Sequence, residues 1–131
     1  MRILCVCEGG NTRSVTLATL LKYNYGNHDA IAMSQGKNKG ETLRMLANWA
    51  NLILAADEEI HTKLLQDLMA QKDGNERKVE LADLGTDKWG MSMHPDLIPL
   101  ACRVLENHGF RSAKEIEEIL ARRARYSPDT L

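Results

Sequence analysis

The sequence predicts an α/β fold, in which a four-stranded parallel sheet carries helices on both faces. Short apolar runs of strand length occur four times, and each is followed by a segment with helical periodicity. These runs are almost continuously apolar, as is typical of parallel strands buried on both faces. No repeat, low-complexity tract or linker interrupts the pattern. We therefore expect one domain that spans residues 1–131.

Composition excludes several classes of protein. The chain is 44% hydrophobic and 27% charged, which is ordinary for a soluble globular protein, and its formal net charge of −1 argues against a general nucleic-acid binder. No apolar stretch approaches the length of a membrane span or a signal peptide. Three cysteines do not suggest an extracellular disulfide framework. We expect a cytoplasmic protein with no membrane or nucleic-acid partner.

The elements can be placed along the chain by periodicity and by helix-end signals. The expected strands are residues 2–6, 30–33, 52–56 and 78–82. Helices are expected over residues 13–25, around 43–50, from the acidic residues at 57–59 to about 69, from Pro95 to about 105, and from 112 to 125. Ser112 and Glu115 have the spacing of a capping box for the last helix. Ligands of such sheets bind at the carboxyl ends of the strands.

The segment at residues 7–14 has the composition of a phosphate-binding loop. It follows a buried strand and precedes a helix, where unpaired backbone N–H groups and the helix dipole favour an anion. The helix N-terminus would stabilise a thiolate at Cys7. Arg13 could bind a phosphate through two parallel hydrogen bonds. The candidate phosphate-binding residues are Glu8, Gly9, Gly10, Asn11, Thr12, Arg13 and Ser14.

A phosphocysteine reaction also needs an acid for the leaving oxygen and a base for water, and one carboxyl group can serve both steps. The loop from Asp83 to His94 leaves the last strand at the same edge of the sheet as Cys7. Asp87 is our first candidate for this acid and Asp83 the second. The alternative is that Asp83 caps the loop and that Asp87 is a solvated surface residue.

The residues at 3–7, the five-residue spacer, Arg13-Ser14 and the helix after them resemble the low-molecular-weight protein tyrosine phosphatases. That resemblance implies a four-stranded parallel sheet, no cofactor and a phosphocysteine intermediate. It also implies that Cys7 is the nucleophile, Arg13 the phosphate clamp and Ser14 the hydroxyl that supports the thiolate. The segment Asp87-Lys88-Trp89 resembles the family's Asp-Pro-Tyr segment, so Asp87 would be the acid and base. Trp89 is a candidate aromatic wall of the substrate site.

The sequence departs from the family pattern at several positions. Gly10 stands where the family usually has asparagine, and Asn11 lies one place later. Thr12 replaces a frequent second cysteine, Val15 replaces a frequent proline, and Lys88 replaces the proline of the acid segment. The resemblance in element order covers roughly residues 1–110, while identity at the level of motifs is confined to the first loop.

Other functions are alternatives. The same fold could serve as an arsenate reductase, which would need further cysteines, or as a catalytically weak phosphate-binding module that regulates a partner. Cys102 is interpreted as a buried thiol of a helix face, and Trp49 as a residue that packs at the edge of the sheet. No Cys or His pairs have the spacing of metal ligands, so no metal is expected. The expected partner is a phosphorylated protein or a small phosphoester.

Overall fold

A computed structural model describes residues 1–9, 12–37, 40–112, 114–115, 118 and 121. The strands of its sheet are β1 (Arg2–Cys7), β2 (Asp29–Ser34), β3 (Leu52–Ala55) and β4 (Val79–Leu81). The described α-helices are α1 (Arg13–Tyr23), α2 (Glu41–Trp49), α3 (Glu58–Gln71) and α4 (Leu97–Asn107), and a 3₁₀ turn, η1 (Asn75–Lys78), precedes β4. The strand order is β2-β1-β3-β4, and every pairing is parallel. The predicted α/β class and its parallel sheet are confirmed.

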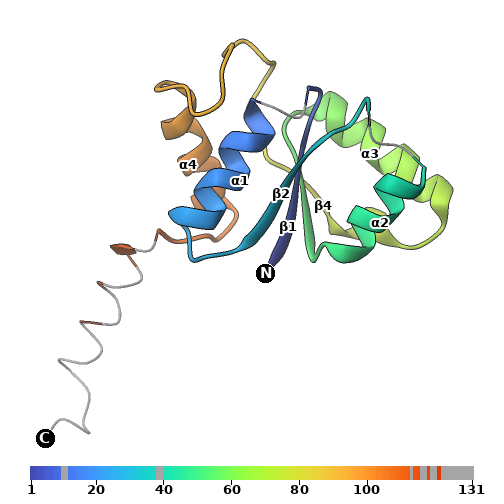
Figure 1. Cartoon of the computed structure of the whole chain (residues 1–131), viewed down its shortest axis with the longest axis horizontal. Coiled ribbons are helices and arrows are strands. Elements are labelled where there is room, and N and C mark those ends of the chain that lie inside the picture. The colour runs from blue at the N-terminus through green and yellow to red at the C-terminus, as the bar shows by residue number, and fades with distance from the viewer. Residues whose placement is uncertain (10–11, 38–39, 113, 116–117, 119–120, 122–131) are drawn as a thin grey trace, which may run out of the picture.

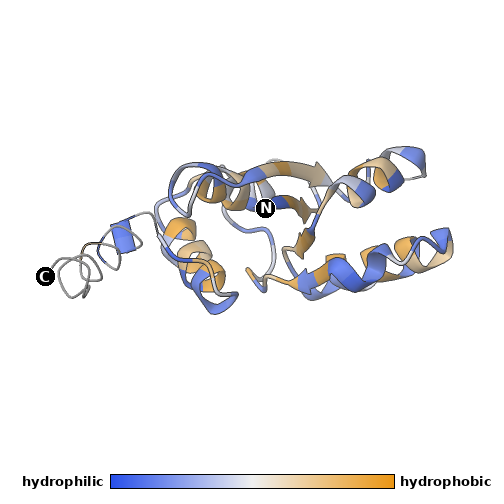
Figure 2. Cartoon of the chain, turned by 90° about the horizontal axis from the view of Figure 1, so that it is seen from below, coloured by the Kyte–Doolittle hydropathy of each residue, from blue (hydrophilic) through white to orange (hydrophobic). Residues whose placement is uncertain are grey.

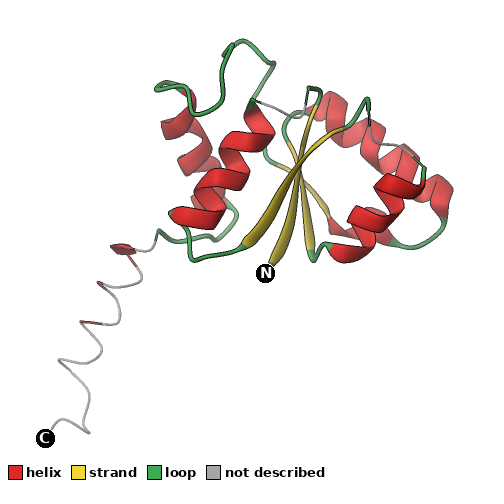
Figure 3. Ribbon diagram, viewed as in Figure 1, coloured by secondary structure: helices red, strands yellow, loops and turns green. Residues whose placement is uncertain are grey.

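The helices form a layer on each face of the sheet. Helices α1 and α4 lie on one side, and α2 and α3 lie on the other (Figure 1; Figure 3). The central strand β1 explains this arrangement, because its side chains alternate between the two layers. Ile3 and Cys5 join the core beneath α1 and α4, whereas Leu4 and Val6 join the core beneath α2 and α3. All four side chains are completely buried, as a strand with helices on both faces requires.

Apolar and polar residues are interspersed along the helices (Figure 2), and the buried residues of α1 include Arg13, Ser14 and Thr16 at its start. In α3 the buried residues are Ile60, Leu64 and Leu68, which recur every four positions. Asp57 caps the start of this helix by accepting a hydrogen bond from the Ile60 N–H at 2.9 Å. At its other end Lys72 is left-handed, with φ of 60°.

The element boundaries differ from expectation by a few residues. Strand β1 continues to Cys7 rather than ending at Val6, and α1 ends at Tyr23 rather than at residue 25. Pro95 is not the first residue of α4, which begins at Leu97. The Leu97 and Ile98 N–H groups bond to the His94 carbonyl, but the next residue, Pro99, has no N–H to donate to the Pro95 carbonyl, so the regular helical ladder starts later.

The helix expected over residues 112–125 falls largely outside the described residues. Its capping box is described, however. The Ser112 N–H donates to the Glu115 carboxylate at 3.2 Å, and the Glu115 N–H donates to the Ser112 hydroxyl at 3.1 Å. This reciprocal pair confirms the capping box predicted from the sequence.

Packing of α3 on the sheet gives a stability prediction. Leu68→Ala should lower the free energy of unfolding by about 2–5 kcal/mol, because Leu68 is completely buried and its removal leaves a cavity. Met69→Ala, at the next position, is the matched control. Met69 is 60% exposed, so its truncation should change stability by less than about 0.5 kcal/mol. Urea unfolding monitored by circular dichroism measures both values, and equal losses would contradict this packing of α3.

Candidate active site at the carboxyl ends of the strands

The loop predicted to bind phosphate begins where β1 ends. Cys7 is the last residue of β1, and its carbonyl accepts a hydrogen bond from the Gln35 N–H at 3.0 Å. The next carbonyl, that of Glu8, accepts one from the Ser34 hydroxyl at 2.6 Å. The end of β2 therefore fixes the start of the loop. Helix α1 begins at Arg13, so the loop leads into a helix N-terminus, as predicted.

Cys7 and Ser14 face each other inside the protein. The Cys7 Sγ lies 3.0 Å from the Ser14 Oγ in a buried hydrogen bond, and the two side chains are 1% and 0% exposed. With a neutral thiol, sulfur donates to the hydroxyl oxygen. If the thiol ionises, the hydroxyl can rotate and donate to the thiolate instead, because a hydroxyl group both donates and accepts. This geometry matches the thiolate-supporting role that the resemblance implies for Ser14.

Arg13 is buried beneath the loop, with a side chain that is 1% exposed. Its Nη1 donates to the Asp57 carboxylate at 2.6 Å and to the Gly85 carbonyl at 2.5 Å. These acceptors come from the segments that follow β3 and β4. Its Nε is also buried, but it has no hydrogen-bond partner among the described residues. A buried N–H without a partner is costly, and none of the described residues supplies an acceptor for this donor.

Asp57 links Arg13 to helix α3. Its two carboxylate oxygens have different partners. Oδ1 accepts a hydrogen bond from the Ile60 N–H and so caps α3, and Oδ2 accepts a hydrogen bond from Arg13. Burial opposes ionisation of this carboxyl. The hydrogen bonds from Arg13 and Ile60, together with the charge of Arg13, outweigh burial and lower the pKa of Asp57 below its ordinary value. Asp57 is therefore a carboxylate that neutralises the buried guanidinium.

The loop after β4 brings a second carboxyl group near these residues. A cavity of about 240 Å³ is lined by Asp57, Glu58, Glu59, Asp83, Gly85 and Thr86. Asp83 thus borders the same cavity as both acceptors of the Arg13 side chain. Asp83 has a left-handed backbone with φ of 50°, and its side chain is exposed. The placement fits an acid at this edge of the sheet.

Asp87 and Trp89 lie further along the same loop. Asp87 is exposed and makes no hydrogen bond or ion pair within the described part of the chain. Trp89 is half-buried against the core beneath α1 and α4, with its ring 5.8 Å from that of His94 and 5.1 Å from the Lys88 Nζ. The predicted roles of Asp87 as acid and Trp89 as substrate wall remain predictions.

The other predicted loop residues differ in exposure. Glu8 is exposed at the rim, Gly9 is half-buried, and Thr12 is buried at the start of α1. Gly10 and Asn11 lie outside the described residues. The structure thus brings together Cys7, Ser14 and the base of the loop, with Arg13 held from the opposite side by Asp57.

Three participants were missed by sequence reasoning. Asp57 was interpreted only as a favourable acid of the first helical turn, although its position directly after a buried strand places it at the ligand-binding edge. The Gly85 carbonyl, as a backbone group, leaves no signal in the sequence. Thr16 donates to the Thr12 carbonyl at 2.8 Å and accepts from the Met93 N–H at 2.9 Å. It thereby ties the loop after β4 to α1.

The remaining cysteines are separate from this arrangement. Cys5 is completely buried, and burial, followed by the proximity of Cys7, raises the pKa of its thiol. Cys102 lies on α4 as predicted, but it is half-buried rather than buried. No group of three or more His, Cys, Asp or Glu side chains among the described residues is arranged to hold a metal ion. In that same part of the chain, every helix is too short or too polar to cross a membrane.

Comparisons with protein-family models, curated proteins and solved structures found no match for this chain.

The ion pair of Arg13 gives a prediction on stability and pH. Asp57→Asn retains a good helix cap but leaves the guanidinium unneutralised, so it should lower the free energy of unfolding at pH 7 by about 3–5 kcal/mol. The native pKa of Asp57 is lowered. The stability that ionised Asp57 gives to the folded protein is therefore complete at pH values above those at which carboxyl groups ordinarily titrate. It is lost as pH falls through the pKa of Asp57 in the native state.

The difference in the free energy of unfolding between wild type and Asp57→Asn should accordingly become smaller as pH is lowered toward about 3. Urea titrations across this range measure it. Glu58→Gln, which changes the exposed acid at the next position, is the matched control and should show a small effect throughout. A difference for Asp57→Asn that does not vary with pH would contradict the ion-pair role.

Proposed function

We propose that the protein is a cysteine-dependent phosphomonoester hydrolase of the low-molecular-weight protein tyrosine phosphatase type. In this proposal Cys7 is the nucleophile, Arg13 and the loop bind the phosphoryl group, and no cofactor takes part. The substrate is a phosphorylated protein or a small phosphoester. A reducing compartment such as the cytoplasm suits a reaction that depends on a thiol, and none of the chain's three cysteines forms a disulfide.

The unpartnered Nε of Arg13 is the observation that carries the proposal. One side of the guanidinium is fixed by Asp57 and Gly85, while the Nε is buried without a partner among the described residues. A bound phosphate would supply the missing acceptor, and a guanidinium can bind phosphate through two parallel N–H groups. The donor belongs to a loop that also holds a buried cysteine against a hydroxyl. A merely structural arginine would have its donors satisfied by the fold.

The reaction follows from these positions. The thiolate of Cys7 attacks phosphorus, a sulfur–phosphorus bond forms, and the bond to the ester oxygen breaks. The leaving oxygen takes a proton from a carboxylic acid of the loop after β4. The resulting carboxylate then removes a proton from water, which attacks the phosphocysteine and releases inorganic phosphate and the thiolate. Arg13 and the backbone N–H groups of the loop stabilise the charge on the transferred oxygens.

The assignment of Cys7 as nucleophile is tested by substituting the two cysteines of β1, Cys5 and Cys7, separately. Cys7→Ser should reduce hydrolysis of an aryl phosphate at mildly acidic pH to background, because a serine hydroxyl is a far weaker nucleophile than a thiolate. It should still bind inorganic phosphate in calorimetry, because Arg13 and the loop remain. Cys5→Ala is the matched control and should retain turnover. Undiminished activity in Cys7→Ser would refute the assignment, whereas phosphate binding without turnover in the wild type would favour a regulatory phosphate-binding module.

The acid is tested by substituting the two candidates separately. Loss of the acid should slow turnover roughly 10²–10⁴-fold for esters with poor leaving groups, and less for good ones, because only a poor leaving group needs protonation. Asp87→Ala has this effect if the resemblance identifies the acid correctly. Asp83→Ala has it if the cavity shared with Asp57 marks the acid. Steady-state kinetics with phenyl phosphate and nitrophenyl phosphate distinguishes the two candidates. If each variant loses the same fraction of its turnover with both esters, neither Asp83 nor Asp87 is the acid.

A further inference from the structure

We propose that Thr16 is a positioning residue, which holds the segment between Gly85 and Met93 so that Asp87 acts as the acid for the reaction at Cys7. This inference rests on the proposed function and adds a residue to it. It depends on the two hydrogen bonds of the Thr16 hydroxyl, on the backbone conformation of Met93 and on a second contact between the same helix and the same segment.

The directions of the two hydrogen bonds of Thr16 are fixed by chemistry. A carbonyl oxygen only accepts, so the hydroxyl donates its proton to the Thr12 carbonyl, at 2.8 Å. A backbone N–H only donates, so the oxygen of the same hydroxyl accepts from the Met93 N–H, at 2.9 Å. Thr16 is completely buried, so its hydroxyl is shielded from water. A side chain of the same shape without a hydroxyl would deprive the Met93 N–H of this acceptor.

Helix α1 itself does not require this hydroxyl. The Thr12 carbonyl also accepts the Thr16 backbone N–H at 3.0 Å, which is the ordinary hydrogen bond of a helical turn. The additional bond from the side chain is of the kind that threonine makes to the carbonyl four residues earlier in a helix. It fixes the rotation of the hydroxyl and so leaves a lone pair of the oxygen for Met93.

Met93 has a backbone conformation that needs support. Its φ is 56°, in the left-handed region that methionine rarely adopts. Such a conformation persists where surrounding contacts hold it, and it often occurs near functional sites. The hydrogen bond to Thr16 is one such contact, and the Met93 side chain packs against the core beneath α1 and α4. Loss of the Thr16 hydroxyl should therefore loosen the loop at Met93.

The same helix also holds the other end of this segment. The Arg13 side chain donates to the Gly85 carbonyl. Arg13 and Thr16 are three residues apart in the first turn of α1, so they lie on the same face of the helix. Asp87 lies between Gly85 and Met93 in the sequence. Helix α1 therefore fixes the chain on both sides of Asp87.

The other candidate acid is held in a different way. Asp83 lies outside this segment, and the N–H groups of the residues on either side of it bond to carbonyls at the end of β3, each at 2.7 Å. These bonds extend the pairing of β4 with β3 and do not involve α1. Removal of the Thr16 hydroxyl should thus disturb Asp87 and leave Asp83 in place.

The test removes the hydroxyl of Thr16 and then restores it. Thr16→Val keeps the branched shape without the hydroxyl, whereas Thr16→Ser keeps the hydroxyl. In Thr16→Val, kcat/KM for phenyl phosphate should fall roughly 10–100-fold, because a displaced acid no longer protonates the poor leaving group. The value for nitrophenyl phosphate should fall less than about threefold. Inhibition by inorganic phosphate should be unchanged, because Arg13 remains, and Thr16→Ser should retain most of the activity with both esters.

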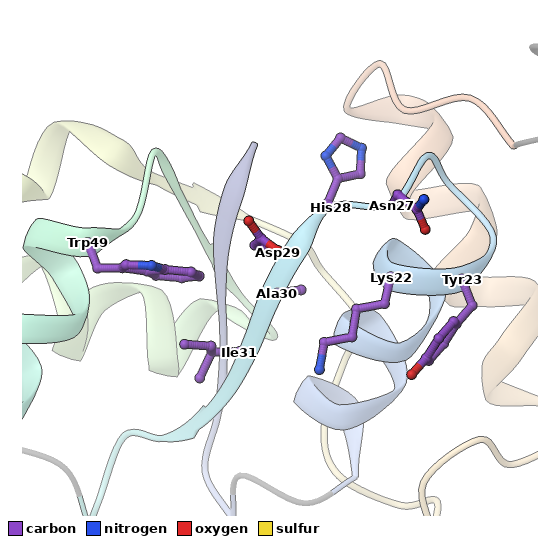
Figure 4. A pocket seen from close by; sticks show the side chains of 8 residues that line it. All are labelled: Lys22, Tyr23, Asn27, His28, Asp29, Ala30, Ile31 and Trp49. Carbon is purple, nitrogen blue, oxygen red and sulfur yellow. The ribbon is translucent and has the colours of Figure 1, made fainter.

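Two control variants separate positioning from stability and from the loss of any hydroxyl. Leu68→Ala creates a cavity on the other face of the sheet and should leave the ratio of the two kcat/KM values unchanged. Tyr23→Phe removes a hydroxyl at the last residue of α1. Tyr23 is 76% exposed and borders a cavity of about 570 Å³ at the start of β2, whereas Cys7 pairs with the end of that strand (Figure 4). All variants are compared at a temperature at which circular dichroism shows them folded.

A double-mutant cycle tests whether Thr16 acts through Asp87. In the Asp87→Ala background, Thr16→Val should cause no further loss with phenyl phosphate. A full additional loss in that background would overturn the inference. So would equal losses with both esters in Thr16→Val, or a loss in Thr16→Ser as large as that in Thr16→Val.

Failure of the proposed function has a different outcome, namely no turnover of either ester by the wild type. The inference is then tested by hydrogen exchange of the Met93 amide, measured by nuclear magnetic resonance. Exchange that is about tenfold faster in Thr16→Val than in the wild type and in Tyr23→Phe supports positioning of the loop by Thr16. Equal exchange in all three proteins refutes it.

Discussion

The contact between Arg13 and Asp57 is the interaction on which the site depends. A guanidinium that is almost fully buried needs a nearby negative charge and satisfied donors, because a buried unpaired charge costs several kcal/mol. Asp57 supplies the charge and Gly85 a further acceptor. The same carboxylate caps α3. The Arg13 side chain thus joins the start of α1 to the residue after β3 and to the loop after β4, and its Nε has no partner among the described residues.

The parallel sheet explains why these groups meet. In a sheet whose strands all point the same way, the carboxyl ends of β1, β2, β3 and β4 lie at one edge. Cys7, Ser34, Asp57 and Asp83 each lie at or just after such an end. Residues far apart in sequence therefore become neighbours without any special connection. The phosphatase chemistry proposed above draws on both the sequence of the first loop and the geometry at this edge.

Sequence reasoning was successful where a single local pattern determines the structure. Continuous apolar runs identified the four strands, and the pattern of the loop after β1 predicted the hydrogen bond between Cys7 and Ser14. It was less successful where partners come from distant segments. The Gly85 carbonyl has no side-chain signature, and the pairing of Arg13 with Asp57 spans 44 positions. The first residue of α4 was misplaced because Pro95 fits both a turn and a first helical position, and because the effect of a second proline, Pro99, which has no N–H for the helical ladder, was not considered.

The bond from Arg13 to Gly85 also has a consequence for how the protein acquires its site. The two residues are 72 positions apart, and contacts of such long range form slowly because a large loop must close first. β1 lies between β2 and β3 and cannot complete its ladders until both have docked. The guanidinium of Arg13 is consequently fixed in place only when the chain has folded through β4. A chain that is still being synthesised, or one that has partly unfolded at β4, would hold a cysteine and an arginine without an ordered site between them.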